Sequence, residues 1–341
     1  MKSMFFTAVI AICFFATANV FAQVGQRTYV FEDGSRSRKI VTEVWYPTNT
    51  IGSVDNESPF VRIPTAQNAK ISNGVYPLIL FSHGTGGGRL TVEWFCAGLA
   101  SKGFIVAAVD HFGNTFDNPI PEAFAKFWER PQDIRFALDQ LLKSDFAASI
   151  NSKAVGAAGF SLGGYTAIAL AGANIDYEAL VKYFKTESGK KEADIPEMPG
   201  LLSLFDKPEI QESFDKAPSL HDQRIKSIFV MAPALGQGFP SREKFNKVTV
   251  PVFIAATEHD QICPVKTNAY HYAALLPAAQ LQIVSADAGH YVFLNEARGM
   301  LKSEAPLLFN DPAGVDRGEV HAKTLSHAVE HFTRTLKHTS R

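Results

Sequence analysis

The sequence predicts an α/β protein with a mostly parallel, eight-stranded sheet that helices cover on both faces. Apolar runs recur along most of the 341 residues, and they are too continuous to have a solvent-facing side. Segments whose apolar residues follow helical spacing alternate with these runs. The runs end in glycine or polar residues, where the strands of a parallel sheet pass into loops. One large domain with an insertion accounts for the length.

Two short segments near the beginning alternate like antiparallel strands, and the other predicted strands are continuous apolar runs. The predicted strands are residues 27–31, 39–45, 75–84, 103–110, 154–160, 225–234, 248–257 and 280–285. The predicted helices are residues 89–102, 131–144, 161–171, 265–276 and about 320–336. The stretch Thr48–Asn73, rich in Gly, Ser, Asn and Pro, is predicted to be a loop. We interpret Glu129, Arg130 and Asp133 as the charged start of the second helix.

The segment Asn174–Arg224 interrupts the alternation of strands and helices. Its first half is charged, and Met198–Phe205 in its middle is apolar. Segments of this length over the carboxyl edge of a sheet often act as lids, so we predict a helical lid insertion at about residues 174–224. The apolar residues either face lipid or pack the insertion onto the rest of the domain, and we favour packing.

The first 22 residues have the layout of a secretory signal peptide. Lys2 precedes an apolar run, and Val20 and Ala22 stand at the −3 and −1 positions of a cleavage site. We expect cleavage after Ala22, a domain over residues 23–341, and export to the periplasm or the medium. A retained N-terminal anchor is the alternative. The net charge of −1 gives no electrostatic reason to expect nucleic acid or an anionic membrane as partner.

Two of the three cysteines lie beyond the predicted signal peptide, namely Cys96 and Cys263. Export to an oxidising compartment permits a disulfide. Nothing local pairs Cys96, in a predicted helix, with Cys263, in a predicted loop. We therefore expect two buried thiols, with a disulfide as the alternative.

The motif that can carry chemistry is G-F-S-L-G, with Ser161 between Gly159 and Gly163 where a predicted strand gives way to a helix. In a G-x-S-x-G nucleophile elbow, a strained strand-to-helix turn exposes a serine hydroxyl. The alternative is a tight turn with a capping serine. A catalytic serine needs a base that takes its proton and an acid that orients the base. Both should follow strand ends, where the loops of an open α/β sheet converge.

Asp260 and His290 each follow the end of a predicted strand beyond Ser161. Ser, Asp, His is one of the known chain orders of a catalytic triad. Glu258 and Asp287 are competing acids, but Glu258 follows its strand too closely, and Asp287 is better explained as shaping the turn before His290. The remaining histidines fit less well because they precede the serine, adjoin the acid, or lie in the insertion or on predicted helices: His83, His111, His221, His259, His271, His321, His327, His331 and His338.

Acyl transfer also needs two hydrogen-bond donors for the oxyanion. The backbone N–H of Leu162, directly after the serine, is one candidate. Thr85 N–H is the other, in the loop Ser82–Gly88, whose glycines let the backbone turn toward the site. This loop lacks the lysine and the spacing of a phosphate-binding loop. Adjacent pairs such as Asp110 and His111 do not converge easily on one ion, so we expect no cofactor and no metal.

In chain order, these motifs resemble the α/β-hydrolase superfamily: FSHGTGG, AAVDH, WERPQDIRFALDQLL, GFSLGGYTAIALAG, TVPVFIAATEHDQICP and AGHYVFL. Within it, the chain is similar to the bacterial predicted dienelactone hydrolases, a group related to platelet-activating factor acetylhydrolase. The resemblance implies an α/β-hydrolase fold with Ser161 as nucleophile, Asp260 as acid and His290 as base. It also implies main-chain oxyanion donors at Thr85 and Leu162.

The resemblance covers roughly residues 70 to 338 and has one departure. Relatives usually have histidine before the nucleophile, and this chain has Phe160. We expect Phe160 to change the packing beside the turn and to leave catalysis intact. A dienelactone hydrolase has a cysteine nucleophile, and this chain has Ser161 at that place, so the name of the group is not the expected activity.

The expected protein is an exported serine hydrolase that cleaves a small-molecule or lipid carboxylic ester through an acyl-enzyme on Ser161. One alternative is a phospholipase A2-like acetylhydrolase of short-chain phospholipids, with transient lipid contact through the lid. Others are a polyester hydrolase, against which the long insertion argues, and a non-catalytic binding protein, against which the three retained triad candidates argue.

Overall fold

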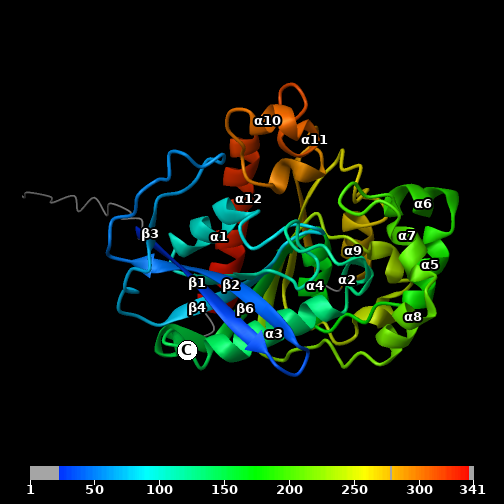
Figure 1. Cartoon of the computed structure of the whole chain (residues 1–341), viewed down its shortest axis with the longest axis horizontal. Helices are drawn as coiled ribbons and strands as arrows, with labels where there is room; N and C mark the ends of the chain where they lie inside the picture. Colours follow the sequence, from blue (N-terminus) through cyan, green and yellow to red (C-terminus); the bar gives the residue numbers. More distant parts are fainter. Residues whose placement is uncertain (1–22, 277–278, 338–341) are drawn as a thin grey trace, which may run out of the picture.

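The computed structural model describes residues 23–276 and 279–337 (Figure 1), so the predicted signal peptide lies outside the described residues. The strands of this part of the chain are β1 (Gln23–Asp33), β2 (Arg38–Thr48), β3 (Thr65–Gln67), β4 (Tyr76–Ser82), β5 (Ile105–Val109), β6 (Ile150–Phe160), β7 (Ile225–Met231), β8 (Val252–Thr257) and β9 (Gln280–Ser285). They form one sheet in the order β3-β1-β2-β5-β4-β6-β7-β8-β9.

The sheet is mostly parallel, as predicted. β2 pairs antiparallel with β1 and with β5, whereas all neighbours from β5 to β9 are parallel. The predicted number of eight strands is wrong, because the described residues hold nine. The additional strand, β3, lies inside the predicted loop Thr48–Asn73 and pairs with β1. Three residues are too few to show an alternating pattern, so sequence periodicity could not find it.

The helices of the described residues are α1 (Glu93–Ala100), α2 (Pro121–Ala125), α3 (Glu129–Leu141), α4 (Leu162–Leu170), α5 (Tyr177–Phe184), α6 (Glu187–Ala193), α7 (Leu201–Phe205), α8 (Pro208–Asp215), α9 (Ala269–Leu275), α10 (Leu301–Glu304), α11 (Pro306–Phe309) and α12 (Arg317–Phe332). Short 3-10 segments are η1 (Ala147–Ser149), η2 (Gly236–Gly238), η3 (Arg242–Phe245) and η4 (His290–Phe293), and a π-helical turn η5 (Thr333–Lys337) follows α12. None of these helices is long and apolar enough to cross a membrane.

Helices cover both faces of the sheet, and β4 shows how its side chains divide between them. Leu78 and Leu80 point into the core cluster that includes residues of α3 and α4. Ile79 and Phe81 point into the opposite cluster, which includes residues of α1 and α12. Because successive residues of a strand face opposite sides, a strand buried on both faces must be apolar throughout. This confirms the interpretation of the continuous apolar runs.

Some helix boundaries differ from the prediction. α1 begins at Glu93 rather than at residue 89, because polar groups at residues 89–92 bond elsewhere: Arg89 N donates to Asp110 Oδ1 at 2.6 Å, and Thr91 Oγ1 donates to Gly88 O at 2.8 Å. α9 is shorter than the predicted 265–276. α2, α10 and α11, of four or five residues each, were not predicted, since one turn of helix leaves no periodic pattern.

The insertion carries α5, α6, α7 and α8, which lie together on the side of the molecule opposite β1 and β3 (Figure 1). The apolar run Met198–Phe205 packs inward. Leu201, Leu204 and Phe205 are buried in the cluster that also holds α3 and α4. The preferred interpretation, that these residues fasten the insertion to the domain, is therefore confirmed. Cys96 and Cys263 are buried free thiols, as expected.

Candidate active site

Ser161 lies on the turn between β6 and α4 with φ 55° and ψ −121°. Residues other than glycine rarely adopt a positive φ, and such strain is typical of functional sites. Backbone hydrogen bonds hold the turn: Ser161 N donates to Met231 O at 2.9 Å, and Ser161 O accepts from Gly164 N at 2.8 Å. The side chain is 6 % exposed. The turn has the geometry expected of a nucleophile elbow.

The glycines beside Ser161 allow three backbone segments to approach one another closely. A Cβ atom on Gly159 would lie 2.0 Å from Gly163 O, and one on Gly163 would lie 1.9 Å from Ser82 O. Both separations are far inside van der Waals contact. The elbow therefore requires glycine at these two positions.

Asp260 and His290 form a buried hydrogen-bonded pair, with His290 Nδ1 2.7 Å from Asp260 Oδ2. The other carboxylate oxygen, Asp260 Oδ1, accepts from the N–H groups of Ile262 at 2.9 Å and Cys263 at 2.7 Å. A carboxylate on Nδ1 favours the imidazole tautomer with hydrogen on Nδ1, which leaves Nε2 as a proton acceptor. The predicted acid and base are thus in contact.

Ser161 and His290 line the same cleft, so the structure brings all three predicted triad residues together. The Ser161 hydroxyl, however, lies 3.9 Å from Cys263 Sγ, and in the described residues it makes no hydrogen bond to His290. Burial raises the pKa of the Cys263 thiol well above its usual value, with Asp260 adding to the effect, so the thiol is neutral. Nothing in the sequence pattern predicts that this thiol lies beside the serine.

Phe160 stands where relatives usually have histidine, and its ring packs against the imidazole of His290 with centroids 4.7 Å apart. The side chain is buried. It forms part of the wall beside the elbow, as expected, and it has no group that could take part in proton transfer.

The predicted oxyanion donors lie on two sides of Ser161. Thr85 lines both cavities that reach the serine, and Leu162 lines the smaller one. Within the described residues, neither the Thr85 N–H nor the Leu162 N–H donates a hydrogen bond to another protein atom. Leu162 is also the first residue of α4, where the helix dipole favours negative charge. Both N–H groups are therefore available to a ligand.

Two cavities meet at Ser161. The smaller has a volume of about 60 Å³, and apolar side chains of the insertion, among them Phe184, Leu201 and Phe205, form part of its wall. The larger has a volume of about 740 Å³ and is lined by the loop that carries Thr85 and by the turn that carries His290. A ligand bound at the serine can therefore extend in two directions, one narrow and apolar and the other wide.

Glu197, in the insertion between α6 and α7, lines both cavities. Its Oε1 accepts a hydrogen bond of 2.8 Å from the hydroxyl of Tyr291, the residue next to His290. A Cβ atom on Gly86 would lie 3.1 Å from Glu197 Cβ, so the insertion also packs against the loop that carries Thr85. The insertion therefore contacts both sides of the candidate site.

Comparison with known proteins adds a likeness of fold and a likeness of sequence. The structure of a ferulic acid esterase from Streptomyces cinnamoneus superposes with a TM-score of 0.59 at 18 % identity, over 95 % of this chain and 93 % of that one. A family model described as "Platelet-activating factor acetylhydrolase, isoform II" matches residues 49–116. The protein therefore has an α/β-hydrolase fold and a local sequence likeness to the platelet-activating factor acetylhydrolases.

The sequence likeness of this chain to its curated relatives is local. The platelet-activating factor acetylhydrolase of Gallus gallus is 46 % identical over 52 residues, which are 15 % of this chain and 12 % of that protein. That of Bos taurus is 53 % identical over 49 residues, 14 % of this chain and 11 % of that protein. The family match contains Thr85 and ends before Ser161. The predicted triad residues of this chain therefore lie outside the matched segment.

The competing acids make no hydrogen bond or ion pair with His290 in the part of the chain that the structure describes. Glu258 Oε2 accepts a hydrogen bond of 2.5 Å from Tyr270. The Asp287 side chain is 76 % exposed and lies 3.9 Å from His259 Nδ1. Asp260 is thus the acid among the three that bonds to His290.

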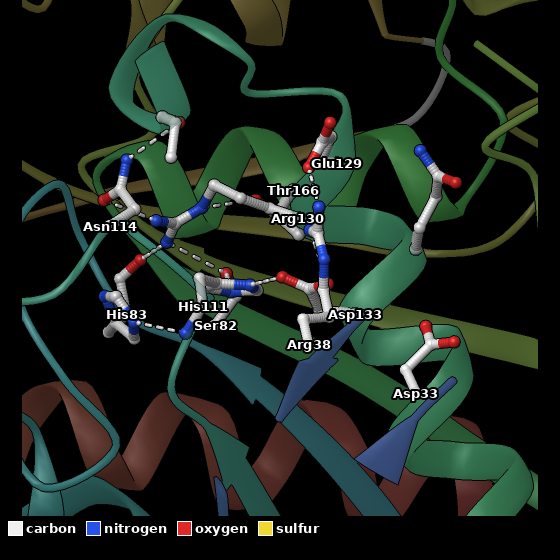
Figure 2. Close-up of polar contacts among 12 residues, drawn as sticks. Asp33, Arg38, Ser82, His83, His111, Asn114, Glu129, Arg130, Asp133 and Thr166 are labelled. Carbon is white, nitrogen blue, oxygen red and sulfur yellow. Dashed lines mark hydrogen bonds and ion pairs between the residues drawn. The ribbon is translucent and has the colours of Figure 1, made fainter. Parts of the chain in front are cut away.

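The sequence interpretation missed a buried polar network beneath the Thr85 loop (Figure 2). Glu129, Arg130 and Asp133 lie at the start of α3, as expected, although the helix begins two residues before the predicted 131, and Arg130 and Asp133 are buried, at 2 % and 1 % exposed. One signal could have shown this. Arg130 and Asp133 lie on the same helical face as the buried Ile134 and Ala137, at spacings of three to seven residues.

Proposed function

We propose that the protein is a serine hydrolase that cleaves carboxylic esters through an acyl-enzyme on Ser161. One observation carries this proposal: three features lie around one cleft. They are the strained turn at Ser161, the buried Asp260–His290 pair, and two backbone N–H groups that donate no hydrogen bond to the described residues. These are the parts that acyl transfer requires. The family relationship supports ester cleavage independently of the site geometry.

In the proposed reaction, the Ser161 hydroxyl turns from Cys263 toward His290 and attacks the ester carbonyl carbon. Its proton passes to His290 Nε2, and the oxyanion receives hydrogen bonds from Thr85 N–H and Leu162 N–H. Collapse breaks the carbon–oxygen bond, and the alcohol leaves with the proton from the imidazolium. Water then repeats the steps on the acyl-enzyme and releases the acid and free Ser161.

A test compares wild type with Ser161→Ala, using p-nitrophenyl acetate as substrate and a fluorophosphonate probe as covalent label. We expect the substitution to lower kcat by at least about 10³-fold and to abolish labelling, with the folded state retained. Unchanged hydrolysis in Ser161→Ala would refute the proposal. Absence of an adduct on Ser161 in folded wild-type protein would favour a non-catalytic binding protein.

A second candidate is an acetylhydrolase of short-chain phospholipids. The cavity of about 60 Å³ favours it, because roughly 10–15 Å³ suffices for one water molecule and the pocket therefore holds only a handful of non-hydrogen atoms. The wide cleft could take the rest of the lipid. Phe116, 74 % exposed, and Leu90, 38 % exposed, line this cleft, so lipid would approach here rather than over the buried Met198–Phe205 run.

Chain-length preference separates the two candidates. p-Nitrophenyl esters from acetate to octanoate would be assayed together with a phosphatidylcholine carrying a two-carbon sn-2 chain, with and without vesicles. The phospholipid candidate predicts a steep preference for the shortest chains and turnover of the phospholipid. Turnover of simple esters alone would leave the general esterase.

We also propose that the protein is exported to the periplasm or the medium after removal of residues 1–22. The layout of the N-terminal segment supports this proposal. Mass spectrometry of the protein isolated from its cells tests it: a mature N-terminus at residue 23 is expected, and an intact leader in a membrane fraction would indicate a retained anchor.

A further inference from the structure

We propose that Arg130 is a positioning residue that holds both oxyanion donors of the site in place, an inference that rests on the esterase function proposed above. Arg130 does not touch the cleft or the serine. Its guanidinium bonds to both segments that present the donors, to His83 O in the loop before α1 and to Thr166 Oγ1 one turn beyond Leu162 on α4 (Figure 2).

The guanidinium holds the donor loop on both sides of Thr85. On one side, Arg130 Nη2 donates to the carbonyl oxygen of His83. On the other side, Arg130 Nη1 donates to Asn114 Oδ1 at 3.0 Å, and the same oxygen accepts from Gly86 N at 3.0 Å. The Thr85 N–H belongs to the peptide group between these two, and each of its neighbours is thus tied to one rigid cation, one directly and one through Asn114, which restricts the direction of the Thr85 N–H.

The same guanidinium reaches the second donor through α4. Arg130 Nε donates to Thr166 Oγ1 at 3.4 Å, and Thr166 Oγ1 donates to the carbonyl oxygen of Leu162 at 3.0 Å. Thr166 is fully buried, so water does not compete for these bonds. One side chain therefore links the two backbone segments whose separation sets the width of the oxyanion site.

A second layer of polar contacts fixes the orientation of this arrangement. Ser82 Oγ accepts from Arg130 Nη2 at 3.3 Å and lies 2.8 Å from His111 Nε2, and His111 Nδ1 lies 3.1 Å from Asp133 Oδ2. Burial lowers the pKa of His111 far below its usual value, with Arg130 adding to the effect, so the ring is neutral. Its hydrogen then stands on Nδ1, and Nε2 accepts from Ser82.

His83 also helps to hold the Thr85 loop through hydrogen bonds of its ring. Its Nδ1 lies 2.6 Å from Gly84 O, and its Nε2 accepts from His111 N at 3.2 Å. Burial, followed by the charge of Arg130, keeps this ring neutral by lowering its pKa. Every polar contact of Arg130 described above is with a neutral acceptor. A planar guanidinium with five fixed donors can make these contacts together, and an ammonium group cannot.

The test uses Arg130→Lys and Arg130→Gln in the full chain, with two readouts that loss of stability alone would not move together. Removing one oxyanion donor typically lowers kcat by about 10²–10³-fold, so loosening two of them should lower kcat/KM by about 10–100-fold. The inhibition constant of a trifluoromethyl ketone, whose serine adduct carries an oxyanion, should rise by a similar factor. The low-pH ionisation in the kcat/KM profile should stay where it is in wild type, because His290 is untouched.

Asn114 gives a second pair of variants in case the arginine variants do not fold. Asn114→Ala removes the oxygen that joins Arg130 to Gly86, whereas Asn114→Asp retains an acceptor there. We expect Asn114→Ala to show the same parallel loss, Asn114→Asp to remain within about threefold of wild type, and Asn114→Ala to add little to Arg130→Gln. Arg224→Lys, which alters an arginine paired with Asp139 and Asp222, is the matched control and should change neither readout.

The outcomes separate this inference from the proposed function. If wild-type protein has no activity that depends on Ser161, the esterase proposal fails, and the positioning role, which rests on it, fails with it. If wild type is active and the folded Arg130 and Asn114→Ala variants match it in kcat/KM and inhibition constant, the positioning role is refuted. A fall in kcat/KM without weaker ketone binding also refutes it, since the loss would then lie outside the oxyanion site.

Discussion

At the scale of single residues, Ser161 keeps a backbone conformation that costs of order 1–3 kcal/mol. Its neighbours impose it. Ser161 N is bonded to the end of β7 at Met231 O, and Ser161 O accepts from both Gly164 N and Ala234 N, the latter at 3.1 Å. Tyr165 N also donates to Ser161 O at 3.4 Å, and these four backbone bonds to one strained residue leave the turn little freedom to relax. The strain is therefore a fixed property of the fold, and it keeps the hydroxyl at the floor of the cleft.

The close backbone contacts around the turn also make the elbow glycines sensitive to a single added methyl group. Gly163→Ala should destabilise the protein by at least about 1–3 kcal/mol, because the new Cβ would lie 1.9 Å from Ser82 O, a backbone atom that cannot move aside alone. Thermal unfolding measures the effect. Gly34→Ala is the control, since a Cβ there meets nothing within 4 Å. Equal melting temperatures for the two variants would contradict the argument.

The acid of the triad can be identified by a matched pair of amide substitutions. Asp260→Asn should lower kcat/KM by about 10²–10⁴-fold with the fold intact, because an amide no longer orients and stabilises the imidazole as a carboxylate does. Glu258→Gln should leave the rate nearly unchanged, since Glu258 bonds to Tyr270 and not to His290. Steady-state kinetics on p-nitrophenyl acetate measures both. An active Asp260→Asn beside an inactive Glu258→Gln would reverse the assignment.

At the scale of elements, α1 and α12 hold the short η4 turn that begins with His290. Trp94 Nε1, on α1, donates to Phe293 O at 2.9 Å. His321 Nε2, on α12, donates to Val292 O at 2.7 Å. The Trp94 and His321 rings are stacked with centroids 3.9 Å apart and planes 5° apart. A turn of four residues cannot fix its own orientation, so the two helices supply it.

We therefore expect Trp94→Phe to act on catalysis although the side chain is remote from the serine. The substitution keeps an aromatic ring on His321 and removes the bond to Phe293 O, which should lower kcat/KM by about tenfold because base placement tolerates little movement. Tyr46→Phe also removes one hydrogen bond to a backbone carbonyl, that of Ala69. It should cost similar stability without slowing the reaction. Equal rates in the two variants would show that the bond to η4 serves stability only.

At the scale of the whole molecule, the sequence pattern predicts the sheet and the proposed triad, but it does not predict the buried polar residues that hold the Thr85 loop. Asp260 and His290 could be predicted because parallel strands end at one edge of the sheet, so residues just after strand ends meet there. The roles of Arg130 and Asn114 could not be predicted in this way. Nothing in the sequence around the start of α3 shows that this helix packs against the loop Ser82–Gly88. A charged residue in a sequence is ordinarily expected at the surface, and here that expectation fails.

The burial of polar groups through the core makes the molecule sensitive to acid. Burial lowers the pKa of four histidines, and that of His321 and His331 falls to about 4. A histidine with a folded pKa below its unfolded value near 6.5 binds fewer protons when folded, so its full contribution is present above pH 6.5. That contribution is lost as the pH falls from 6.5 toward 4. Asp133 opposes this loss below pH 6, because burial raises its pKa to about 6.

Melting curves from pH 7.5 to 4.5 should therefore show a steep fall in Tm below pH 6.5, and one histidine's share can be isolated. His331 is buried on α12, and its Nε2 lies 2.9 Å from Ser227 Oγ. The lowered pKa of His331 alone accounts for on the order of 3 kcal/mol of the stability lost in acid. His331→Gln removes the titration, so its stability should be lower at pH 7.5 but should decline less with acid. If His331→Gln declines as steeply as wild type, protonation of His331 does not drive the acid transition.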